Sequence, residues 1–400
     1  MATKIDKIFD SFTKESIFKN KFILQTNYTP ETIPHRDEQI KQIASILAPC
    51  LRLEKTSNLF LYGKTGSGKT LSIQYIKNQL LKRAKKRNIP LKIEYINCKL
   101  RKIADTEYRI IAELIRKLGE KVPATGLPTE QIYAKFIEIL EREKQMLILV
   151  LDEVDQAVHK IGDSFLYNLT RINSELNKTQ ISIVGVSNDL RFLENIDPRV
   201  RSSLGEEEIV FPPYNALQLQ DILKKRANLS FKKRRIASGV IEKCSALAAR
   251  EHGDARRALD LLRIAAELAE RDGKKKVTLD YIDKANHKIE RDKILDVIET
   301  EPKQFQLTLL AIIHLSEKKT KKIFTGDVYS IYQNLCKQIS YEVLTQRRIS
   351  DIIAEFDMLG IINAKVISKG RYGRTREIKL AIPEPLIEKA KNILDESLFK

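Results

Sequence analysis

The amino-acid sequence predicts an α/β core with a parallel β-sheet, followed by an α-helical segment and a C-terminal winged-helix domain. Three observations support this fold class. A glycine-rich loop stands between a short apolar run and a helical pattern near residue 65. Further apolar runs end in polar side chains, as buried parallel strands do. The last hundred residues carry three helical patterns and then two strand patterns.

The composition is that of a globular protein with two or three domains. Of 400 residues, 42% are hydrophobic and 31% are charged. No apolar run is long enough to cross a bilayer, and the charged N-terminus lacks a secretory signal, so we expect a cytoplasmic protein without a membrane partner. The four cysteines are far apart and the five histidines are scattered. We therefore expect reduced thiols and no metal cluster apart from a nucleotide's own Mg²⁺.

The charge balance favours a polyanionic partner. The formal net charge is +18, which is typical of proteins that bind nucleic acid. A lysine-rich surface that serves solubility or growth at high temperature is the alternative. Net charge alone does not distinguish a nucleic-acid-binding protein from one with a lysine-rich surface. The positions of the charges along the chain must distinguish them.

Helical and strand patterns alternate along the predicted core. Helical patterns cover residues 38–53, 71–76, 104–118 and 129–143, and strand patterns cover residues 59–62, 92–97, 146–151, 181–186 and 208–211. Pro212 and Pro213 then break the chain. We therefore expect a first domain at residues 1–213, in which the N-terminal arm packs on the core.

The glycine-rich loop has the pattern of a phosphate-binding P-loop. Glycines let several backbone N–H groups approach a polyphosphate closely, and the N-terminus of the following helix adds a partial positive charge. We predict that Lys69 reaches the β- and γ-phosphates of ATP and that Thr70 ligates Mg²⁺. The predicted contacts are Gly63, Lys64, Thr65, Gly66, Ser67, Gly68, Lys69, Thr70 and Leu71.

Two carboxylates follow the most apolar strand pattern. Asp152 and Glu153 come directly after residues 146–151. A central parallel strand would bring them to the ligand at its carboxyl end. We predict that Asp152 holds Mg²⁺ through water and that Glu153 orients and deprotonates the attacking water. Acidic residues after a strand often only begin a loop, but the P-loop upstream favours the catalytic interpretation.

Polar residues farther along the chain extend the predicted site. Asn188 follows residues 181–186, so it could hydrogen-bond the γ-phosphate or the attacking water. Arg199 or Arg201 could act as an arginine finger on the nucleotide of a neighbouring subunit. The alternative is that both arginines are surface residues, and the sequence leaves this choice open.

The helical segment has its own candidate cation. Helices are predicted at residues 216–228, 238–252, 254–271 and 278–291, within a second domain at residues 214–300. Asp254 can cap the third helix, and Arg256 lies in its first turn. A cation there opposes the helix dipole, which makes sense if Arg256 reaches a phosphate. Alternatively, Arg256 and Arg257 face water.

Residues 301–400 have the pattern of a winged helix. Helices at residues 304–315, 326–339 and 345–359 precede strands at 361–368 and 375–380. The third helix would enter a major groove with its N-terminal residues, and the tip of the hairpin would approach a DNA backbone or minor groove. A winged helix that binds protein is the alternative. The predicted DNA contacts are Gln346, Arg347, Arg348, Lys369, Arg371, Tyr372, Arg374 and Arg376.

Together these motifs resemble archaeal replication initiators of the origin-recognition and helicase-loader type, which are AAA+ ATPases with a C-terminal winged helix. The resemblance covers about residues 28–380 and is carried by GKTGSGKT, LVLDEVD, VSND, DPRVRSSL, FPPYNALQLQDILKKR and GDARRALDLLR, in the expected order. It implies an αβα ATPase core, a helical lid and a DNA-binding wing. It also implies bound ATP or ADP with Mg²⁺, and slow hydrolysis.

The resemblance assigns roles around the nucleotide. It implies that the loop at residues 28–37 borders the adenine pocket, and that Tyr214 and Arg226 contact nucleotide from the start of the lid. Asn188 and Arg256 resemble the first and second sensors of the family.

The resemblance also implies contacts with macromolecular partners. Arg201 would be the arginine finger exchanged with a paralogous initiator subunit. Residues 98–106 lie where these initiators carry a short insertion that grips DNA, and Arg101 and Lys102 suit that role. The implied partners are double-stranded origin DNA and the replicative helicase.

The combined prediction is a nucleoid-associated initiator that binds origin duplex DNA, helps to recruit the helicase and uses slow ATP hydrolysis as a switch. A motor or clamp-loader-like AAA+ ATPase is one alternative, and it would show fast, DNA-stimulated turnover in a stable ring. A nucleotide-regulated winged-helix transcription factor is another. A nucleotide kinase is disfavoured because the lid and the wing would have no purpose.

Overall fold

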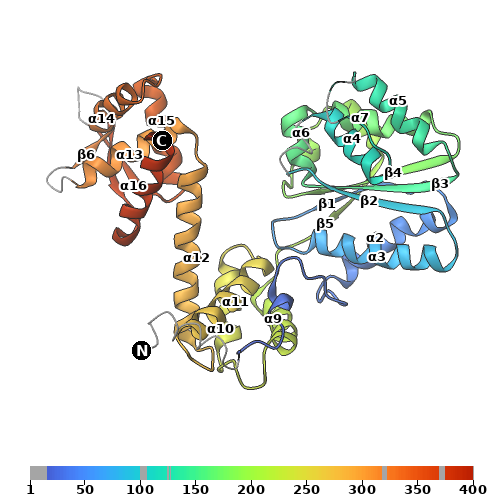
Figure 1. The fold of residues 1–400 in the computed structure, drawn as a ribbon, viewed down its shortest axis with the longest axis horizontal. Coiled ribbons are helices and arrows are strands. Elements are labelled where there is room, and N and C mark those ends of the chain that lie inside the picture. Colours follow the sequence, from blue (N-terminus) through green and yellow to red (C-terminus); the bar gives the residue numbers. More distant parts are fainter. Residues whose placement is uncertain are drawn as a thin grey trace, which may run out of the picture. The chain divides into compact units, whose positions relative to one another are not determined.

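The computed structural model describes residues 16–99, 106–123, 126, 128–317, 322–368 and 374–399. The chain, drawn in Figure 1, divides into two compact units, Met1–Ile282 and Asp283–Lys400. Each unit has its own hydrophobic core. The first unit contains the predicted α/β core and most of the helical segment. The predicted boundaries after residues 213 and 300 stay predictions.

A five-stranded parallel sheet forms the centre of the first unit, as the sequence predicted. Its order is β2-β3-β4-β1-β5. The strands are β1 (Asn58–Tyr62), β2 (Leu91–Asn97), β3 (Gln145–Asp152), β4 (Thr179–Ser187) and β5 (Glu206–Val210). Because all the strands run the same way, the polar residues after β1, β3 and β4 meet at one edge of the sheet.

Helices cover both faces of this sheet (Figure 1). One face carries α2 (Asp37–Leu47) and α3 (Lys69–Lys86), whose apolar residues pack on Leu59, Leu61, Ile148 and Val150. The other face carries α4 (Glu107–Lys117), α5 (Thr129–Leu140), α6 (Val154–Ile161) and α7 (Ser164–Arg171). Side chains alternate across each strand, so β1 sends Leu59 and Leu61 to one face and Phe60 and Tyr62 to the other.

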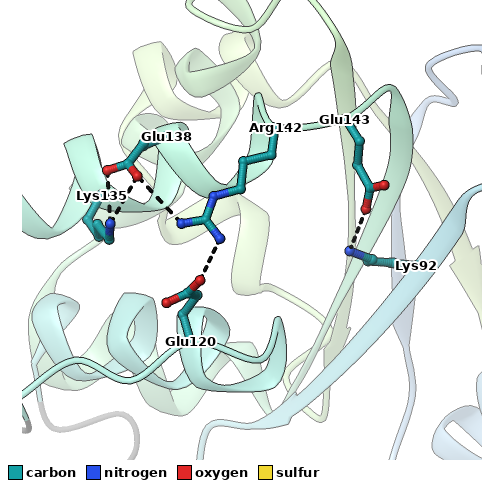
Figure 2. A network of polar contacts seen from close by, with 6 residues as sticks. All are labelled: Lys92, Glu120, Lys135, Glu138, Arg142 and Glu143. Carbon is teal, nitrogen blue, oxygen red and sulfur yellow. Dashed lines mark hydrogen bonds and ion pairs between the residues drawn. The ribbon is translucent and has the colours of Figure 1, made fainter.

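Ion pairs link charged side chains on the surface beside α4 and α5 (Figure 2). Arg142 lies between Glu120 and Glu138, and Lys135 pairs with Glu138 at 2.9 Å. Lys92 of β2 faces Glu143 at 3.5 Å. Water screens exposed pairs of this kind, so the apolar core and not this network stabilises the fold.

The rest of the first unit is helical. It contains α9 (Ala216–Ser230), α10 (Val240–Arg250) and α11 (Ala255–Arg271), and the short helix η1 (Lys21–Leu24) packs against α9 and α11. The apolar face of α11 is buried, and Asp254 caps the helix as predicted by accepting from the Arg256 N–H at 2.7 Å. The next helix, α12 (Leu279–Thr300), is longer than the predicted residues 278–291. No glycine or proline interrupts it.

The second unit is a winged helix. It contains α13 (Lys303–Glu317), α14 (Thr325–Gln338), α15 (Gln346–Met358) and an antiparallel sheet of order β6-β8-β7. The strands are β6 (Ile323–Phe324), β7 (Ile362–Ser368) and β8 (Arg374–Leu380). The sequence prediction lacked two elements, β6 and the C-terminal helix α16 (Glu384–Phe399).

A close contact at the centre of the large sheet gives a stability prediction. Gly185 of β4 lies opposite Phe60 of β1, and a Cβ atom at Gly185 would lie 2.3 Å from the Phe60 ring. We expect Gly185→Ala to lower the free energy of unfolding by about 1–3 kcal/mol, because the ring is held in a packed core. Chemical denaturation checks this. Gly326→Ala in α14 is the control, since its Cβ would meet open space. Equal stability of both variants would contradict the prediction.

Candidate functional site

A cavity of about 850 Å³ opens at the carboxyl edge of the parallel sheet. Its wall combines the glycine-rich loop, the ends of β3 and β4, most of residues 25–34, and the helices α9 and α11. The volume lies within the range of about 300–1,000 Å³ typical of small-molecule and cofactor sites. All of these elements belong to the first unit.

The glycine-rich loop has the conformation that its sequence predicts. Gly66 and Gly68 have φ of +69° and +94°, which side-chain-bearing residues rarely adopt. A Cβ at Gly66 would lie 1.8 Å from Asp254 Oδ1, so only glycine fits there. Of the predicted contacts, the cavity is lined by Thr65, Gly66, Gly68, Lys69, Thr70 and Leu71, and not by Gly63, Lys64 or Ser67.

The Lys69 ammonium lies at the bottom of the loop. It donates to the carbonyls of Gly63 at 2.6 Å and Lys64 at 3.0 Å, and to Asn188 Oδ1 at 3.0 Å. Burial lowers the pKa of Lys69 to about 8, an effect that Asp152 opposes and Arg256 reinforces. The structure therefore brings Lys69 and Asn188 together, as the sequence predicted for groups that act on one phosphate.

Oxygen donors suited to Mg²⁺ lie beside this lysine. Thr70 Oγ1 donates to Asp152 Oδ2 at 3.0 Å. Among the described residues there is no group of three His, Cys, Asp or Glu side chains that would hold a metal by themselves. One hydroxyl and one carboxylate fit an ion that takes its other ligands from water and substrate phosphates, which is how Mg²⁺ is usually bound.

Tyr95 is a residue of this site that the sequence did not indicate. Its hydroxyl donates to Asp152 Oδ2 at 2.6 Å, and burial, followed by the charge of Asp152, raises the pKa of Tyr95. The register Asn97↔Asp152 places the end of β2 beside the end of β3. Tyr95 therefore fixes the Asp152 carboxylate in position. An alternating strand pattern contains no signal for such a contact.

Glu153 has a strained backbone. Its φ of +55° is in the left-handed region, where a non-glycine residue costs about 1–3 kcal/mol. The carboxylate lines the cavity, and the Lys99 ammonium lies 3.8 Å from Glu153 Oε2. Strain of this kind persists where surrounding structure fixes a functional side chain, which fits the predicted role of Glu153.

The N-terminus of α11 contacts the P-loop. The Ala255 N–H donates to the Gly66 carbonyl at 3.3 Å. Arg256 is exposed and lines the cavity, whereas Arg257 pairs with Glu251 at 3.0 Å. The two neighbouring arginines therefore differ, and only Arg256 is placed for contact with a ligand in the cavity.

Arg36 is a second residue that sequence reasoning missed. It is 2% exposed and donates to the Ser67 carbonyl at 2.8 Å, to the His35 carbonyl at 3.0 Å and to the Pro212 carbonyl. The guanidinium lies 3.8 Å from the centroid of the Tyr214 ring. Burial lowers the pKa of Arg36, and the facing Tyr214 opposes that shift. One side chain thus joins the P-loop to the segment that leads into α9.

We expect the loss of this junction to weaken nucleotide binding. Arg36→Met would leave the buried Ser67 carbonyl without this donor, at a cost of about 1–3 kcal/mol, and would also remove the part-buried hydrogen bond to the Pro212 carbonyl. We expect a fall in ATP affinity of roughly tenfold or more, measured by titration with a fluorescent ATP analogue. Arg52→Met removes an exposed arginine that pairs only locally with Glu54, and it is the matched control. Unchanged affinity in Arg36→Met would contradict the role of this residue.

Three further residues that the sequence predicted for the site, Tyr214, Arg226 and Arg201, lie outside the carboxyl edge of the sheet. Tyr214 is buried and lines the cavity with its ring on Arg36. Arg226 also lines the cavity, where it donates to the Ile23 carbonyl at 3.2 Å and lies 4.5 Å from the Tyr28 ring centroid. Arg201, in α8 (Pro198–Leu204), does not line the cavity.

The Arg201 guanidinium has partners in its own chain. It lies 3.6 Å from Glu206 and 3.8 Å from Glu208 of β5. Because Arg201 does not line the cavity, its role as an arginine finger on a neighbouring subunit stays a prediction. Such action would require Arg201 to leave the two carboxylates, which sequence reasoning did not anticipate.

The second unit presents cations at the start of α15. Gln346, Arg347 and Arg348 are all exposed, and the side chain of Thr345 caps the helix. Arg348 lies 4.0 Å from Asp351 and 3.9 Å from Glu355. Arg347 is therefore the stronger candidate for a phosphate or base contact.

The predicted wing is only partly described. Arg376 donates to the Ser350 carbonyl and, at 3.2 Å, to its hydroxyl, so it ties β8 to α15. Predicted DNA contacts outside the described residues are Lys369, Arg371, Tyr372, Arg101 and Lys102, together with the side chain of Arg374.

Comparisons with known proteins cover both units. Family profiles match an AAA domain at residues 52–193, a Cdc6 AAA+ ATPase-type lid domain at 220–287 and a CDC6 C-terminal winged helix domain at 296–390. No helix in the described part of the chain is long and apolar enough to span a membrane.

Similar proteins match over nearly the full length. The ORC1-type DNA replication protein of Pyrococcus furiosus is 52% identical over 384 residues, which is 95% of this chain and 91% of the relative. That of Sulfurisphaera tokodaii is 49% identical over 98% of this chain and 96% of its own. The solved structure of the Aeropyrum pernix ORC1 protein in complex with DNA has 42% identity and a TM-score of 0.83, with 96% of this chain and 98% of that chain covered.

Proposed function

Because the chain belongs to the ORC1-type DNA replication proteins, which carry an AAA domain with a Cdc6-type lid and winged helix, we propose that it is an ATP-controlled initiator of DNA replication. In this proposal it binds duplex DNA at a replication origin and helps to recruit the replicative helicase. Its partners include a paralogous subunit that exchanges an arginine finger. The similarity to the Aeropyrum pernix ORC1 protein, which was solved in complex with DNA, supports the DNA partner.

The main support for nucleotide binding in this proposal is that the α/β core and the lid line one shared cavity. Lys69 and Asn188 come from the α/β core and Arg256 comes from α11, yet all three line one cavity. A ligand that ends in a γ-phosphate would touch groups of the core and of the lid together. Loss of that phosphate would remove the shared contact, and this difference in contacts is what a nucleotide switch requires.

The chemistry follows from the placement of each group. Water attacks the γ-phosphorus in line, the bond from that phosphorus to the bridging oxygen breaks, and ADP and phosphate result. Glu153 accepts the proton of the water, while Asn188 orients the water or the phosphate. Lys69 and Arg256 offset the negative charge. Thr70 and Asp152 would hold Mg²⁺, which neutralises phosphate charge when it is bound.

The proposed DNA binding is based on residues of the second unit. The exposed start of α15, with Gln346, Arg347 and Arg348, would enter a major groove, as the second helix of a helix-turn-helix does. Arg376 would support this helix from β8 through Ser350, in place of contacting DNA itself. The tip of the hairpin, with Lys369, Arg371, Tyr372 and Arg374, is proposed to contact the backbone or the minor groove.

The test of the proposed function is a footprint on origin DNA from the protein's own chromosome, with and without ATP. We expect origin protection that changes with the nucleotide, and we expect Arg347→Glu/Arg348→Glu to lower affinity about tenfold or more. The slope of log affinity against log salt should become shallower by about 2, since each lost phosphate contact contributes about 0.9. Lys85→Glu/Arg87→Glu, at the exposed end of α3, changes the charge equally and is the control. Protection of promoters alone would favour a transcription factor.

A further inference from the structure

A second basic surface lies on the helical lid of the first unit. Two short connections form it, one between α9 and α10 and the other between α11 and α12. The Val277 N–H donates to the Arg235 carbonyl at 2.8 Å, and the Ala237 N–H donates to the Val277 carbonyl at 2.9 Å. The Arg235 guanidinium also reaches the Lys275 carbonyl at 3.3 Å. Two separate basic runs therefore form one surface, the lid basic patch: Lys232, Lys233, Arg234, Arg235, Arg271, Lys274, Lys275 and Lys276.

Most of this charge is open to solvent. Six of the eight side chains are exposed, namely Lys233, Arg234, Arg271, Lys274, Lys275 and Lys276. None of these six forms an ion pair with a described residue. Elsewhere on the same lid, by contrast, Arg263 pairs with Asp260 at 2.8 Å and with Glu267 at 2.9 Å. Arg263 is therefore neutralised by carboxylates of its own helix, whereas the six exposed cations of the patch lie without a carboxylate partner among the described residues.

Acidic residues are nearly absent from the two connections. Residues 231–239 and 273–279 contain no Asp or Glu. The second run is flanked by Asp272 and Asp280, of which Asp272 accepts from the Tyr281 hydroxyl at 2.9 Å. Arg234 also has a φ of +62°, a left-handed conformation that costs a non-glycine residue about 1–3 kcal/mol. Like charges at close range repel each other, so this arrangement is unfavourable until an anion approaches.

The helix dipole explains in part why Arg271 and the following lysines lie at the end of α11. Cations at a helix C-terminus interact favourably with the helix dipole. That effect extends only over the last turn, so it does not account for Lys233 and Arg234, which the backbone bonds bring to the same surface from another connection. A shared polyanionic partner accounts for both runs.

We propose that the lid basic patch binds the phosphates of double-stranded DNA without reading its sequence. Lysines dominate the patch, and an ammonium on a flexible stem suits a phosphate oxygen better than the edge of a base. The inference rests on the DNA-binding function proposed above and adds a contact surface separate from the second unit. It predicts that part of the salt dependence of DNA binding comes from the lid.

The test compares two triple substitutions in the full-length protein. Lys274→Ala/Lys275→Ala/Lys276→Ala removes three charges from the patch. Lys85→Ala/Lys86→Ala/Arg87→Ala removes three exposed charges from the end of α3 and has the same net charge. Binding to a 60-base-pair duplex of arbitrary sequence is followed by fluorescence anisotropy at several salt concentrations. Titration with a fluorescent ATP analogue shows that each variant retains its nucleotide site and is folded.

We expect the lid variant to bind about tenfold more weakly than the control variant near 0.1 M salt, with a salt slope shallower by roughly 1 to 3. Equal behaviour of the two variants would overturn the proposal, since only total charge would then matter. Full affinity of the lid variant would also overturn it and would leave an acidic protein segment as the candidate partner. Failure of the unchanged protein to bind any duplex would instead contradict the proposed DNA function itself.

Discussion

Replacing Lys69 by alanine should abolish ATP binding and leave most of the affinity for DNA. Lys69 is 5% exposed, and its ammonium is held by two carbonyls and Asn188 at the bottom of the P-loop. Alanine would remove both the cation and its fixed donors. Hydrogen bonds to charged groups contribute about 1.5–3 kcal/mol each, so we expect ATP affinity to fall roughly 100-fold or more. Calorimetric titration with Mg-ATP measures this loss.

The control and the DNA measurement separate the two functions. Lys64→Ala removes a lysine of the same loop whose ammonium lies 3.3 Å from His252 and does not line the cavity. We expect this variant to retain ATP binding. Anisotropy with duplex DNA should give similar affinities for the unchanged protein, Lys64→Ala and Lys69→Ala. An equal loss of ATP and DNA binding in Lys69→Ala would contradict separable sites.

Replacing Glu153 by glutamine should stop hydrolysis while ATP still binds. The amide keeps the shape of the carboxylate, but it cannot accept a proton from water. General-base catalysis contributes about 10²- to 10⁴-fold, so we expect the rate of phosphate release to fall by at least roughly 100-fold. The ATP dissociation constant should change only a few-fold, because Asp152 and Lys69 remain in place.

Single-turnover release of the γ-phosphate from labelled ATP is the appropriate measurement, because product release does not then limit the rate. Glu207→Gln, at an exposed residue of β5, makes the same chemical change away from the cavity and should leave the rate unchanged. Hydrolysis at the original rate in Glu153→Gln would assign the base to another residue.

Sequence reasoning identified the parts of the site that are contiguous in the chain. The P-loop and the two carboxylates after β3 are recognisable because each signal, a glycine pattern or an apolar run, lies within one short continuous stretch of the sequence. Their meeting at one edge follows from a general property of parallel sheets. Arg36 and Tyr95 were missed for the opposite reason. Their partners are a carbonyl at Pro212 and the carboxylate at Asp152, far away in the sequence.

The same distinction holds for the fold. Helices with a clear apolar stripe, such as α11 and α15, were predicted within a few residues. The two-residue strand β6 is too short for any periodicity and exists only through its pairing with β8. The helix α16 carried a readable signal, since Leu386, Ala390, Leu394 and Leu398 recur at four-residue spacing and are buried.

The contacts of Arg36 have a consequence for mutational tolerance. Its acceptors are the main-chain oxygens of residues 35, 67 and 212. Exchanging the side chains at those three positions would leave each oxygen available, whereas no other amino acid can supply the three-way donation from position 36. The junction that joins the phosphate loop to the segment leading into α9 therefore depends on one residue, and no change at an acceptor position can restore these hydrogen bonds once Arg36 is replaced.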